Sequence, residues 1–310
     1  MTQSTLNLRG AIYGITAAAI WGGMYVVSDV VLLTIPPFTL LTIRLLLGLL
    51  VLVIILRQRQ DVQMPSRRQW LQVLGVGFIG FGLSVGAQFV GTDKSTAVNG
   101  ALITSASPAF ILIFAVLILR ERLTARRIMA VALATVGVVV IIDPAQVDFS
   151  TDTFHGDVAL GIAALTWGFY SVLVRAVSAR EDSERGLDTL VVTLIAFIGG
   201  LLLTIPAALL ELPARPVGDI DLGTILGVLY LGVISTAVAM WMWNRAFALV
   251  DASVASLFFF AQPVTGALLG ALFLGQPMTT GLWAGGLLIA LGVLLSIYPP
   301  QNLRHRFARR

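Results

Sequence analysis

The sequence predicts an all-α integral membrane protein of ten transmembrane helices, arranged as two inverted repeats of five helices each. Three observations lead to this fold class. Hydrophobic residues make up 57% of the 310 residues, and charged residues make up 12%. Apolar segments long enough to cross a bilayer follow one another along almost the whole chain. The two halves of the chain also align with each other at matching glycine, proline and tryptophan positions.

The composition argues against several kinds of site. A soluble domain carries about 25% charged residues, so the low charged fraction and the mean hydropathy of +0.93 indicate a surface that faces lipid. The absence of cysteine excludes disulfides, iron–sulfur clusters and thiolate metal sites. His155 and His305 both lie outside the apolar segments, which leaves no histidine for a metal site or a Ser/His/Asp triad within the membrane. We therefore expect no metal, no cofactor and no enzymatic activity.

The predicted helices follow in order from the N-terminus. Arg9 precedes an apolar run that is too long for the core of a cleavable signal peptide, so this run is expected to be the first membrane helix. Each span needs about 20 mainly apolar residues. The fifth candidate is the shortest, and the linkers are mostly too short to hold a soluble domain. The ten segments are Ala11–Leu33, Pro36–Leu56, Trp70–Val90, Ala97–Leu119, Arg127–Ile142, Gly156–Val174, Leu187–Leu210, Leu222–Leu249, Ala252–Leu274 and Gly281–Ile297.

The basic residues predict the orientation of this bundle. If the N-terminus is cytoplasmic, 16 of the 20 basic residues fall in cytoplasmic segments, whereas Lys94 and Arg215 fall outside and Arg44 and Arg245 lie within spans. Positively charged loops stay in the cytoplasm, so we expect both termini there, in a bacterial inner membrane. The basic residues are spread over short loops and form no continuous soluble face, so no nucleic-acid partner is expected.

An internal repeat divides the chain into residues 1–145 and 146–310, with five predicted helices in each part. Trp21 aligns with Trp167 at an offset of 146 residues, and Pro108 aligns with Pro263 at an offset of 155 residues. Gly77 and Gly232 share the second offset. Because five is odd, the second repeat enters the membrane from the opposite side. Inverted repeats are typical of secondary transporters, whose substrate site lies near the midplane between the repeats.

Two motifs at the ends of the fourth and ninth predicted helices carry a family resemblance. The first is Ser105-Ala-Ser-Pro108 followed by Leu117-Ile-Leu-Arg-Glu-Arg-Leu123, and the second is Gln262-Pro-Val264 followed by Leu272-Phe-Leu-Gly-Gln-Pro-Met278. On these residues the whole chain resembles the drug/metabolite transporter superfamily, in particular its ten-helix EamA-type members.

The resemblance implies the EamA transporter fold and the export of metabolites such as amino acids, with bacterial amino-acid exporters of the YddG kind as the nearest comparison. The sequence departs from the family pattern at three positions. Arg120 replaces a frequent glycine, Gln276 replaces a frequent glutamate, and Gln262 stands where an acidic residue often precedes the proline. These departures argue against transport coupled through a carboxylate at those positions.

Pro108 and Pro263 are candidates for hinges or kinks, because each lies 11 residues from the start of its predicted helix. A proline leaves the carbonyl four residues earlier without its helical partner, and such a carbonyl within the membrane must face protein or a water-filled cavity. A kink whose freed carbonyl is bonded by neighbouring residues is the alternative. The symmetric placement of the two prolines favours a place beside a cavity.

Trp21 and Trp167 lie about ten residues into their predicted helices, which is roughly 15 Å from the membrane surface at about 1.5 Å per residue. This is too deep for an interfacial aromatic belt, so we expect both on the wall of a cavity. Tyr25 and Ser171 follow four residues later on the same faces. Other polar residues in spans join the predicted substrate cavity, although helix–helix hydrogen bonds explain each of them equally well. They are Gln88, Asn99, Ser105, Trp241, Trp243 and Gln262.

Asp29 and Arg44 are ionisable residues within the first two spans, and a charge there requires a partner. The short connection between these helices predicts an ion pair near the outer face, with a structural role or, alternatively, the role of a gate. Such a pair would keep Asp29 ionised and make it a poor proton carrier.

The sequence therefore predicts a lipid-embedded secondary transporter that exports small neutral metabolites, most of all amino acids, by alternating access and without obligatory proton coupling. No oligomer is required, because one chain supplies both repeats. A proton-coupled drug exporter is the alternative within transport. A membrane-embedded enzyme is the alternative from another class, and it lacks an intramembrane histidine or cysteine.

Overall fold

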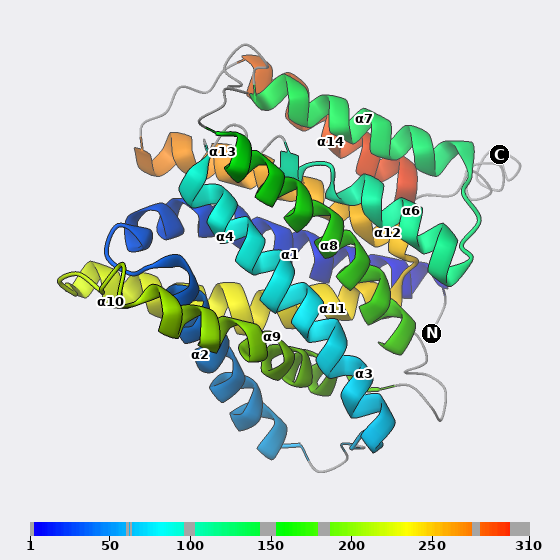
Figure 1. Cartoon of the computed structure of the whole chain (residues 1–310). Coiled ribbons are helices and arrows are strands. Elements are labelled where there is room, and N and C mark those ends of the chain that lie inside the picture. Colours follow the sequence, from blue (N-terminus) through cyan, green and yellow to red (C-terminus); the bar gives the residue numbers. More distant parts are fainter. Residues whose placement is uncertain are drawn as a thin grey trace, which may run out of the picture.

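The computed structural model describes residues 3–59, 62, 64–95, 103–142, 153–178, 187–274 and 280–297. All regular secondary structure in these residues is helical. The helices pack side by side in one bundle (Figure 1). The helical elements are α1 (Gln3–Leu32), α2 (Pro37–Arg57), α3 (Arg67–Gly77), η1 (Phe78–Ser84), α4 (Val85–Lys94), α6 (Ser107–Leu119), α7 (Ala125–Ile142), α8 (Phe154–Ser178), α9 (Thr189–Glu211), α10 (Leu222–Leu229), η3 (Tyr230–Val238), α11 (Ala239–Leu249), α12 (Ala252–Ala255), η4 (Ser256–Phe260), α13 (Ala261–Leu274) and α14 (Thr280–Ile297).

Six helical stretches are long and apolar enough to cross a membrane. They are Leu6–Leu32, Pro37–Arg57, Arg67–Lys94, Phe154–Ser178, Thr189–Glu211 and Leu222–Leu249, and they coincide with the first three predicted spans of each half. Shorter apolar helices cover Ser107–Leu119, Ala252–Gly266 and Trp283–Leu295, in the regions of the fourth, ninth and tenth predicted spans. The fifth predicted span corresponds to α7. Residues 96–102, where the fourth predicted span begins, lie outside the described part of the chain.

Polar residues fix where several helices begin. Ser66 and Gln69 form a capping box at the start of α3, in which each side chain bonds the other residue's backbone N–H. Asp188 accepts from Leu190 N–H, and Asp221 accepts from the hydroxyl and N–H of Thr224. These bonds from Thr224 lower the pKa of the exposed Asp221 carboxyl. The sequence thus marks helix starts by the same rules as in soluble proteins.

The third and eighth predicted spans each change to π-helical geometry in the middle. These segments are η1 and η3, and each joins its flanking α-helices without a break. Gly77 precedes η1 and Gly232 lies within η3, at the offset of 155 residues that the repeat predicts. A π-helical turn widens the helix and changes the direction of its side chains, and such turns are frequent at functional sites.

Gly77 allows a close approach between two helices of the bundle. A Cβ atom on Gly77 would lie 2.0 Å from the carbonyl oxygen of Ala196 in α9. Only a residue without a side chain fits there. The close approach holds the π-helical segment η1 against α9.

The helix contacts are related in pairs. α1 packs against α11 and α13, and the corresponding helix of the second half, α8, packs against α4 and α6. α9 contacts η1, and α2 contacts η3. Two pairs join corresponding helices of the two halves directly: α7 lies along α14 at one side of the bundle, and α2 lies against α9 at the other (Figure 1).

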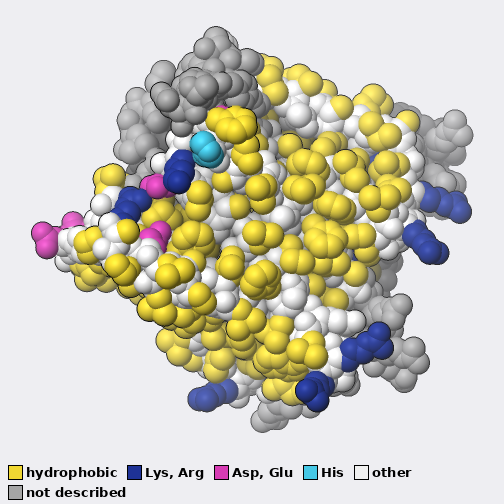
Figure 2. All heavy atoms as spheres, in the orientation of Figure 1, with side chains coloured by type: hydrophobic (Ala, Val, Ile, Leu, Met, Phe, Trp, Pro, Cys, Tyr) yellow, Lys and Arg dark blue, Asp and Glu magenta, His cyan; other side chains and the backbone are white. Residues whose placement is uncertain are grey.

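The surface carries a broad apolar face between two charged ends. Hydrophobic side chains cover the middle of the molecule in Figure 2, while acidic side chains gather at the left together with some basic ones, and basic side chains alone lie at the right and lower edges. Exposed apolar residues such as Leu33, Leu210 and Leu272 are each more than two-thirds accessible. An apolar face of this extent is typical of a surface that contacts lipid.

Candidate functional site

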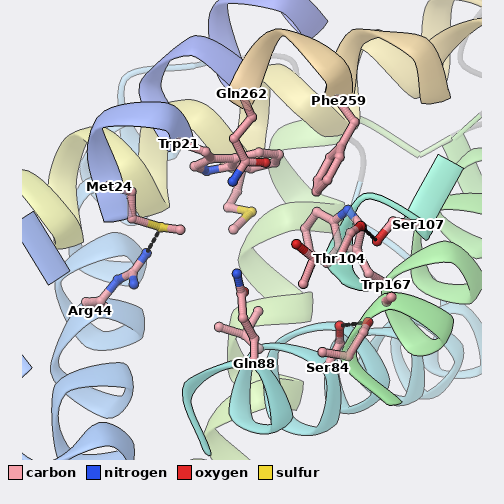
Figure 3. A pocket seen from close by; sticks show the side chains of 14 residues that line it. Trp21, Met24, Arg44, Ser84, Gln88, Thr104, Ser107, Trp167, Phe259 and Gln262 are labelled. Atoms are coloured by element: carbon pink, nitrogen blue, oxygen red, sulfur yellow. Dashed lines mark hydrogen bonds between the residues drawn. The ribbon is translucent and has the colours of Figure 1, made fainter. Parts of the chain in front are cut away.

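A cavity of about 40 Å³ lies in the interior of the bundle, where helices from both halves meet. It is smaller than the roughly 150 Å³ that holds benzene in an engineered protein core, so it has room for water but not for a metabolite. Its wall is mainly apolar and aromatic, with a few polar side chains (Figure 3). The lining residues are Trp21, Met24, Arg44, Ser84, Val85, Gln88, Thr104, Ser107, Ala163, Ala164, Trp167, Met240, Phe259 and Gln262.

Many lining positions are related by the internal repeat. Trp21 and Trp167 share the offset of 146 residues, as the sequence alignment of the two halves predicts. Three further pairs share the offset of 155 residues. They are Val85 with Met240, Thr104 with Phe259, and Ser107 with Gln262. The cavity is therefore built from corresponding faces of the two halves.

The two cavity tryptophans pack edge to face, with ring centroids 5.6 Å apart. Trp243 lies within ring contact of both, 5.2 Å from Trp21 and 6.2 Å from Trp167. Aromatic pairs in such geometry contribute about 0.5–1.5 kcal/mol beyond burial. The aromatic cluster gives the cavity one firm apolar wall.

The π-helical segment η3 anchors two of the lining side chains. The indole N–H of Trp21 donates to the carbonyl of Ser235 at 3.0 Å. Arg44 donates from Nε to the Thr236 hydroxyl at 3.1 Å, and from Nη2 to the Met24 sulfur at 3.2 Å and the Ser235 hydroxyl at 3.4 Å. The non-α geometry of η3 thus supplies acceptors at the cavity that the sequence pattern did not reveal.

The fourth predicted span changes direction at the cavity. A turn at Ser105 and Ala106 precedes α6, and Pro108 is the second residue of that helix. The Ser107 hydroxyl donates to the carbonyl of Thr104 at 2.7 Å. The kink that we predicted inside a helix is therefore a helix start, a position at which proline is well tolerated. The Thr104 carbonyl is bonded by the neighbouring serine.

The ninth predicted span has a comparable irregularity. The short 3₁₀-helix η4 precedes α13, and Pro263 is the third residue of α13. Phe259 from η4 and Gln262 from the first turn of α13 both reach the cavity (Figure 3). Each proline therefore follows an irregular turn that lines the cavity. Whether these turns act as hinges stays a prediction.

Three buried polar atoms of lining residues have no hydrogen-bond partner within the described part of the chain. Two are donors, Arg44 Nη1 and Trp167 Nε1, and the third is the acceptor Gln262 Oε1. Leaving such a group unpaired in a protein interior costs about 1–3 kcal/mol. Polar atoms left without protein partners at a cavity are available to water or to a ligand.

The other predicted cavity residues divide into three groups. Gln88 lines the cavity and extends toward its centre in Figure 3. Ser105, Ser171 and Trp243 are buried but do not line it. Trp243 stacks behind the cavity tryptophans, and its indole N–H donates to the Ser171 hydroxyl at 3.4 Å. Trp241 contacts the Tyr13 ring edge to face and does not line the cavity either. The side chains of Tyr25 and Asn99 lie outside the described residues.

Arg44 differs most from its predicted place. We expected it in an ion pair with Asp29 near the outer end of the bundle, but it lines the interior cavity and is bonded by neutral groups. The Asp29 side chain lies outside the described residues. Among the described residues no carboxylate forms an ion pair with Arg44.

Sequence reasoning missed several lining residues. Met24 lies three residues after Trp21, and a helical-face argument applied to Trp21 would have found it. Val85 and Met240 are related by the same offset as the glycine pair, but apolar residues in an apolar span carry no signal of their own. Ser84 was missed because a serine in a span is usually bonded to a neighbouring helix, and its hydroxyl does donate to the Ala163 carbonyl at 2.8 Å.

Ion pairs gather at the ends of the bundle rather than at the cavity. Glu121 caps the start of α12, where it accepts from the N–H groups of Ala252 and Ser253. Asp251 and Glu121 together pair with Arg127 and Arg175, which joins the ends of four predicted spans. A second pair joins Arg215 to Asp93 at 2.8 Å.

Comparison with known proteins adds the family to this geometry. The chain matches the EamA-like transporter family twice, over residues 8–143 and again over residues 155–298. It is 25% identical to an uncharacterized transporter of Archaeoglobus fulgidus over 89% of this chain and 93% of that protein. It is 23% identical to the uncharacterized transporter YoaV of Bacillus subtilis over 92% and 95% of the two chains.

The chain is also similar to a transporter that is named for its substrate and to a protein of known structure. A riboflavin transporter of Vibrio cholerae is 29% identical to the chain over 63% of this chain and 60% of that protein. A crystal structure superposes with a TM-score of 0.76 and 22% sequence identity, covering 93% of this chain and 97% of the other. The fold of the bundle is therefore that of a solved protein. The family match covers both halves of the chain, and the protein belongs to the EamA-like transporter family.

Proposed function

We propose that this EamA-family protein exports small neutral metabolites, with amino acids as the first class, across a bacterial inner membrane by alternating access and without obligatory proton coupling. The observation that carries this proposal is the cavity between the two halves, which combines an aromatic wall with buried polar atoms that have no hydrogen-bond partner among the described residues. Most ligand sites are apolar pockets with a few well-placed polar groups.

A construction from two inverted five-helix repeats supports this mechanism. The family matches each half separately, and the helix contacts occur in corresponding pairs. In such transporters the substrate site lies between the repeats, and one repeat rocks against the other. We propose ten spans with both termini in the cytoplasm, because this arrangement keeps most basic residues on one side.

The chemistry of the cavity favours a zwitterion or another small polar solute. Trp167 offers an indole donor, and Gln262 offers an amide acceptor. The rings of Trp21, Trp167 and Phe259 line the same space. Aromatic faces attract an ammonium group, so the cavity provides contacts for both ends of an amino acid.

The volume of the cavity supports a change of shape during transport. At about 40 Å³ the space is too small for an amino acid. A solute can occupy this place only if the surrounding helices separate. The irregular turns before α6 and α13 and the π-helical segments η1 and η3 are the places where these helices depart from regular α-geometry.

A proton-coupled drug exporter is the second candidate. Such an exporter would use a carboxylate that binds protons near its substrate site. The described lining residues include no carboxylate. The chain is also similar to a riboflavin transporter, a protein named for a much larger aromatic solute. Larger aromatic solutes are therefore included in the test.

Counterflow in proteoliposomes tests the proposal. Vesicles loaded with one unlabelled solute are diluted into the radiolabelled form of the same solute, for a panel of amino acids, sugars, riboflavin and a cationic dye. We expect accumulation of labelled amino acids whether or not a pH gradient is present. Accumulation of only the dye or riboflavin, or accumulation that requires the pH gradient, would contradict the proposal.

A further inference from the structure

We infer that Arg44 binds the carboxylate group of the transported solute. This inference rests on the proposed function and adds its substrate chemistry: the solute carries a single carboxylate. The argument concerns one residue that the sequence places within a span and the structure places at the cavity.

The first step is the burial of a positive charge that no carboxylate of the described residues neutralises. Arg44 is 2% exposed and lines the cavity. The arginines that form ion pairs with carboxylates in the described structure, Arg59, Arg127, Arg175 and Arg215, all lie near helix ends or in loops. Arg44 has no such partner there. A buried charge is normally paired, because removing it from water is costly.

The second step is the way in which the guanidinium group is held. Its Nε atom donates to Thr236, and its Nη2 atom donates to Ser235 and Met24. Its Cζ atom also lies 5.4 Å from the centre of the Phe89 ring. These neutral contacts fix the group in place without cancelling its charge, and among the described residues Nη1 has no hydrogen-bond partner. A fixed arginine with a free donor is preorganised for an anion.

The third step identifies the anion as a carboxylate. Arg44 is the only basic residue among the fourteen that line the cavity. One guanidinium balances one negative charge, whereas a phosphate group carries up to two and is commonly held by several cationic groups. The unpartnered indole N–H of Trp167 belongs to the same cavity and offers a second neutral donor. Charge-assisted hydrogen bonds to a carboxylate are about twice as strong as neutral ones.

The test compares an amino acid with its own amide, which has nearly the same shape but lacks the negative charge. We would measure the quenching of tryptophan fluorescence on binding to purified protein, since two tryptophans line the cavity. Wild type should bind the acid more tightly than the amide. Arg44→Gln should weaken binding of the acid about tenfold or more, while binding of the amide changes little. Arg44→Lys, which keeps the charge, should retain part of the preference for the acid.

Arg59→Gln is the matched control, because Arg59 is half exposed and pairs with Asp188 away from the cavity. This variant should bind the acid like wild type. Equal binding of acid and amide by wild type, or undiminished binding of the acid by Arg44→Gln, would overturn the inference. If Arg44→Gln does not fold, the uncharged variant Arg44→Met decides by the same titration. Loss of the preference for the acid would support the inference, and an unchanged ratio of acid to amide would overturn it.

The binding titration separates this inference from the proposed function. Counterflow of an amino acid together with equal binding of acid and amide would uphold transport and overturn the role of Arg44. If the preference for the acid depends on Arg44 but no solute of the panel shows counterflow, the carboxylate site is upheld and the proposed transport is overturned.

Discussion

At the scale of single residues, Trp21 and Trp167 occupy corresponding positions in the two halves but differ in hydrogen bonding. The Trp21 indole donates to the Ser235 carbonyl, whereas the Trp167 indole has no partner among the described residues. Their rings are in contact, and both line the cavity. The first indole is therefore bonded within the fold, whereas the second keeps a donor that the described residues do not use.

This difference gives different expectations for two matched substitutions. Trp167→Phe and Trp21→Phe each shorten a buried aromatic side chain and should lose similar packing. Trp21→Phe also breaks a buried hydrogen bond and should lower the free energy of unfolding by about 1 kcal/mol more than Trp167→Phe does, whereas Trp167→Phe should raise the KM for transport several-fold. Thermal unfolding in detergent and initial transport rates measure the two effects. Normal transport by Trp167→Phe would remove this residue from the substrate site.

At the scale of elements, the third predicted span is held against α9 by a close approach of the two backbones rather than by interlocking side chains. Gly77 ends α3 and lies against the backbone of Ala196 in α9, immediately before the π-helical segment that leads to the cavity. Two residues earlier, Gly75 has open space at the position of a Cβ atom. The same helix thus contains one glycine that the packing requires and one that it does not.

Replacement of each glycine by alanine separates packing from helix propensity. Gly77→Ala places a methyl group into the α9 backbone and should destabilise the protein by about 1–3 kcal/mol, as overpacking does. Gly75→Ala has room for its methyl group and should leave stability unchanged or raise it by up to about 1 kcal/mol. Melting temperatures in one detergent compare the pair. Equal effects of the two substitutions would show that the α3–α9 contact is not tight.

The elements also show what the sequence could predict. The apolar runs predicted the long helices, since α2 and α9 begin and end within a few residues of the expected positions. The π-helical geometry of η1 and η3 was not predictable, because glycine and β-branched residues such as theirs occur in regular membrane helices as well, and the i+5 bonding depends on packing against neighbouring helices. The turn at Ser105 and Ala106 just before Pro108 was not predicted either, since a membrane span was assumed to be continuous.

The candidate site was partly predictable from the alignment of the two halves. The repeat placed Trp21 and Trp167 at equal depth, and both line the cavity. Polarity alone was a poor guide for Trp241 and Ser171, because a polar group in a span can equally bond a neighbouring helix. The predicted ion pair of Arg44 with Asp29 stays a prediction, because the Asp29 side chain lies outside the described residues. The contacts of Arg44 with η3 were not predictable, since they depend on a fold that chain proximity does not reveal.

At the scale of the whole molecule, we expect the charges at the two ends to orient the bundle in the membrane. The basic residues after α2, α6 and α8 and at the C-terminus belong to one side under the proposed topology. We expect a periplasm-active reporter fused after Arg310 to give no signal, and the same reporter inserted near Asp219 to give a strong one. A strong signal at the C-terminus would change the number of spans.

The driving force is also a property of the whole molecule. Because the described cavity wall holds an arginine and no carboxylate, transport should follow the gradient of the solute. Collapse of the proton gradient by an ionophore should therefore leave flux down a solute gradient unchanged. Uphill movement of solute driven by an imposed pH gradient alone would contradict this expectation and indicate proton antiport.

The most direct test of the account is whether a transported solute enters this cavity. The chain contains no cysteine, so Gln88→Cys would introduce a single thiol into the cavity wall, and Met64→Cys would place one in an exposed loop as the control. The measurement is the rate of maleimide labelling with and without a saturating amino acid that shows counterflow. We predict severalfold slower labelling of the Gln88→Cys variant and an unchanged rate for the Met64→Cys variant. Equal rates for the Gln88→Cys variant with and without the transported amino acid would contradict the account.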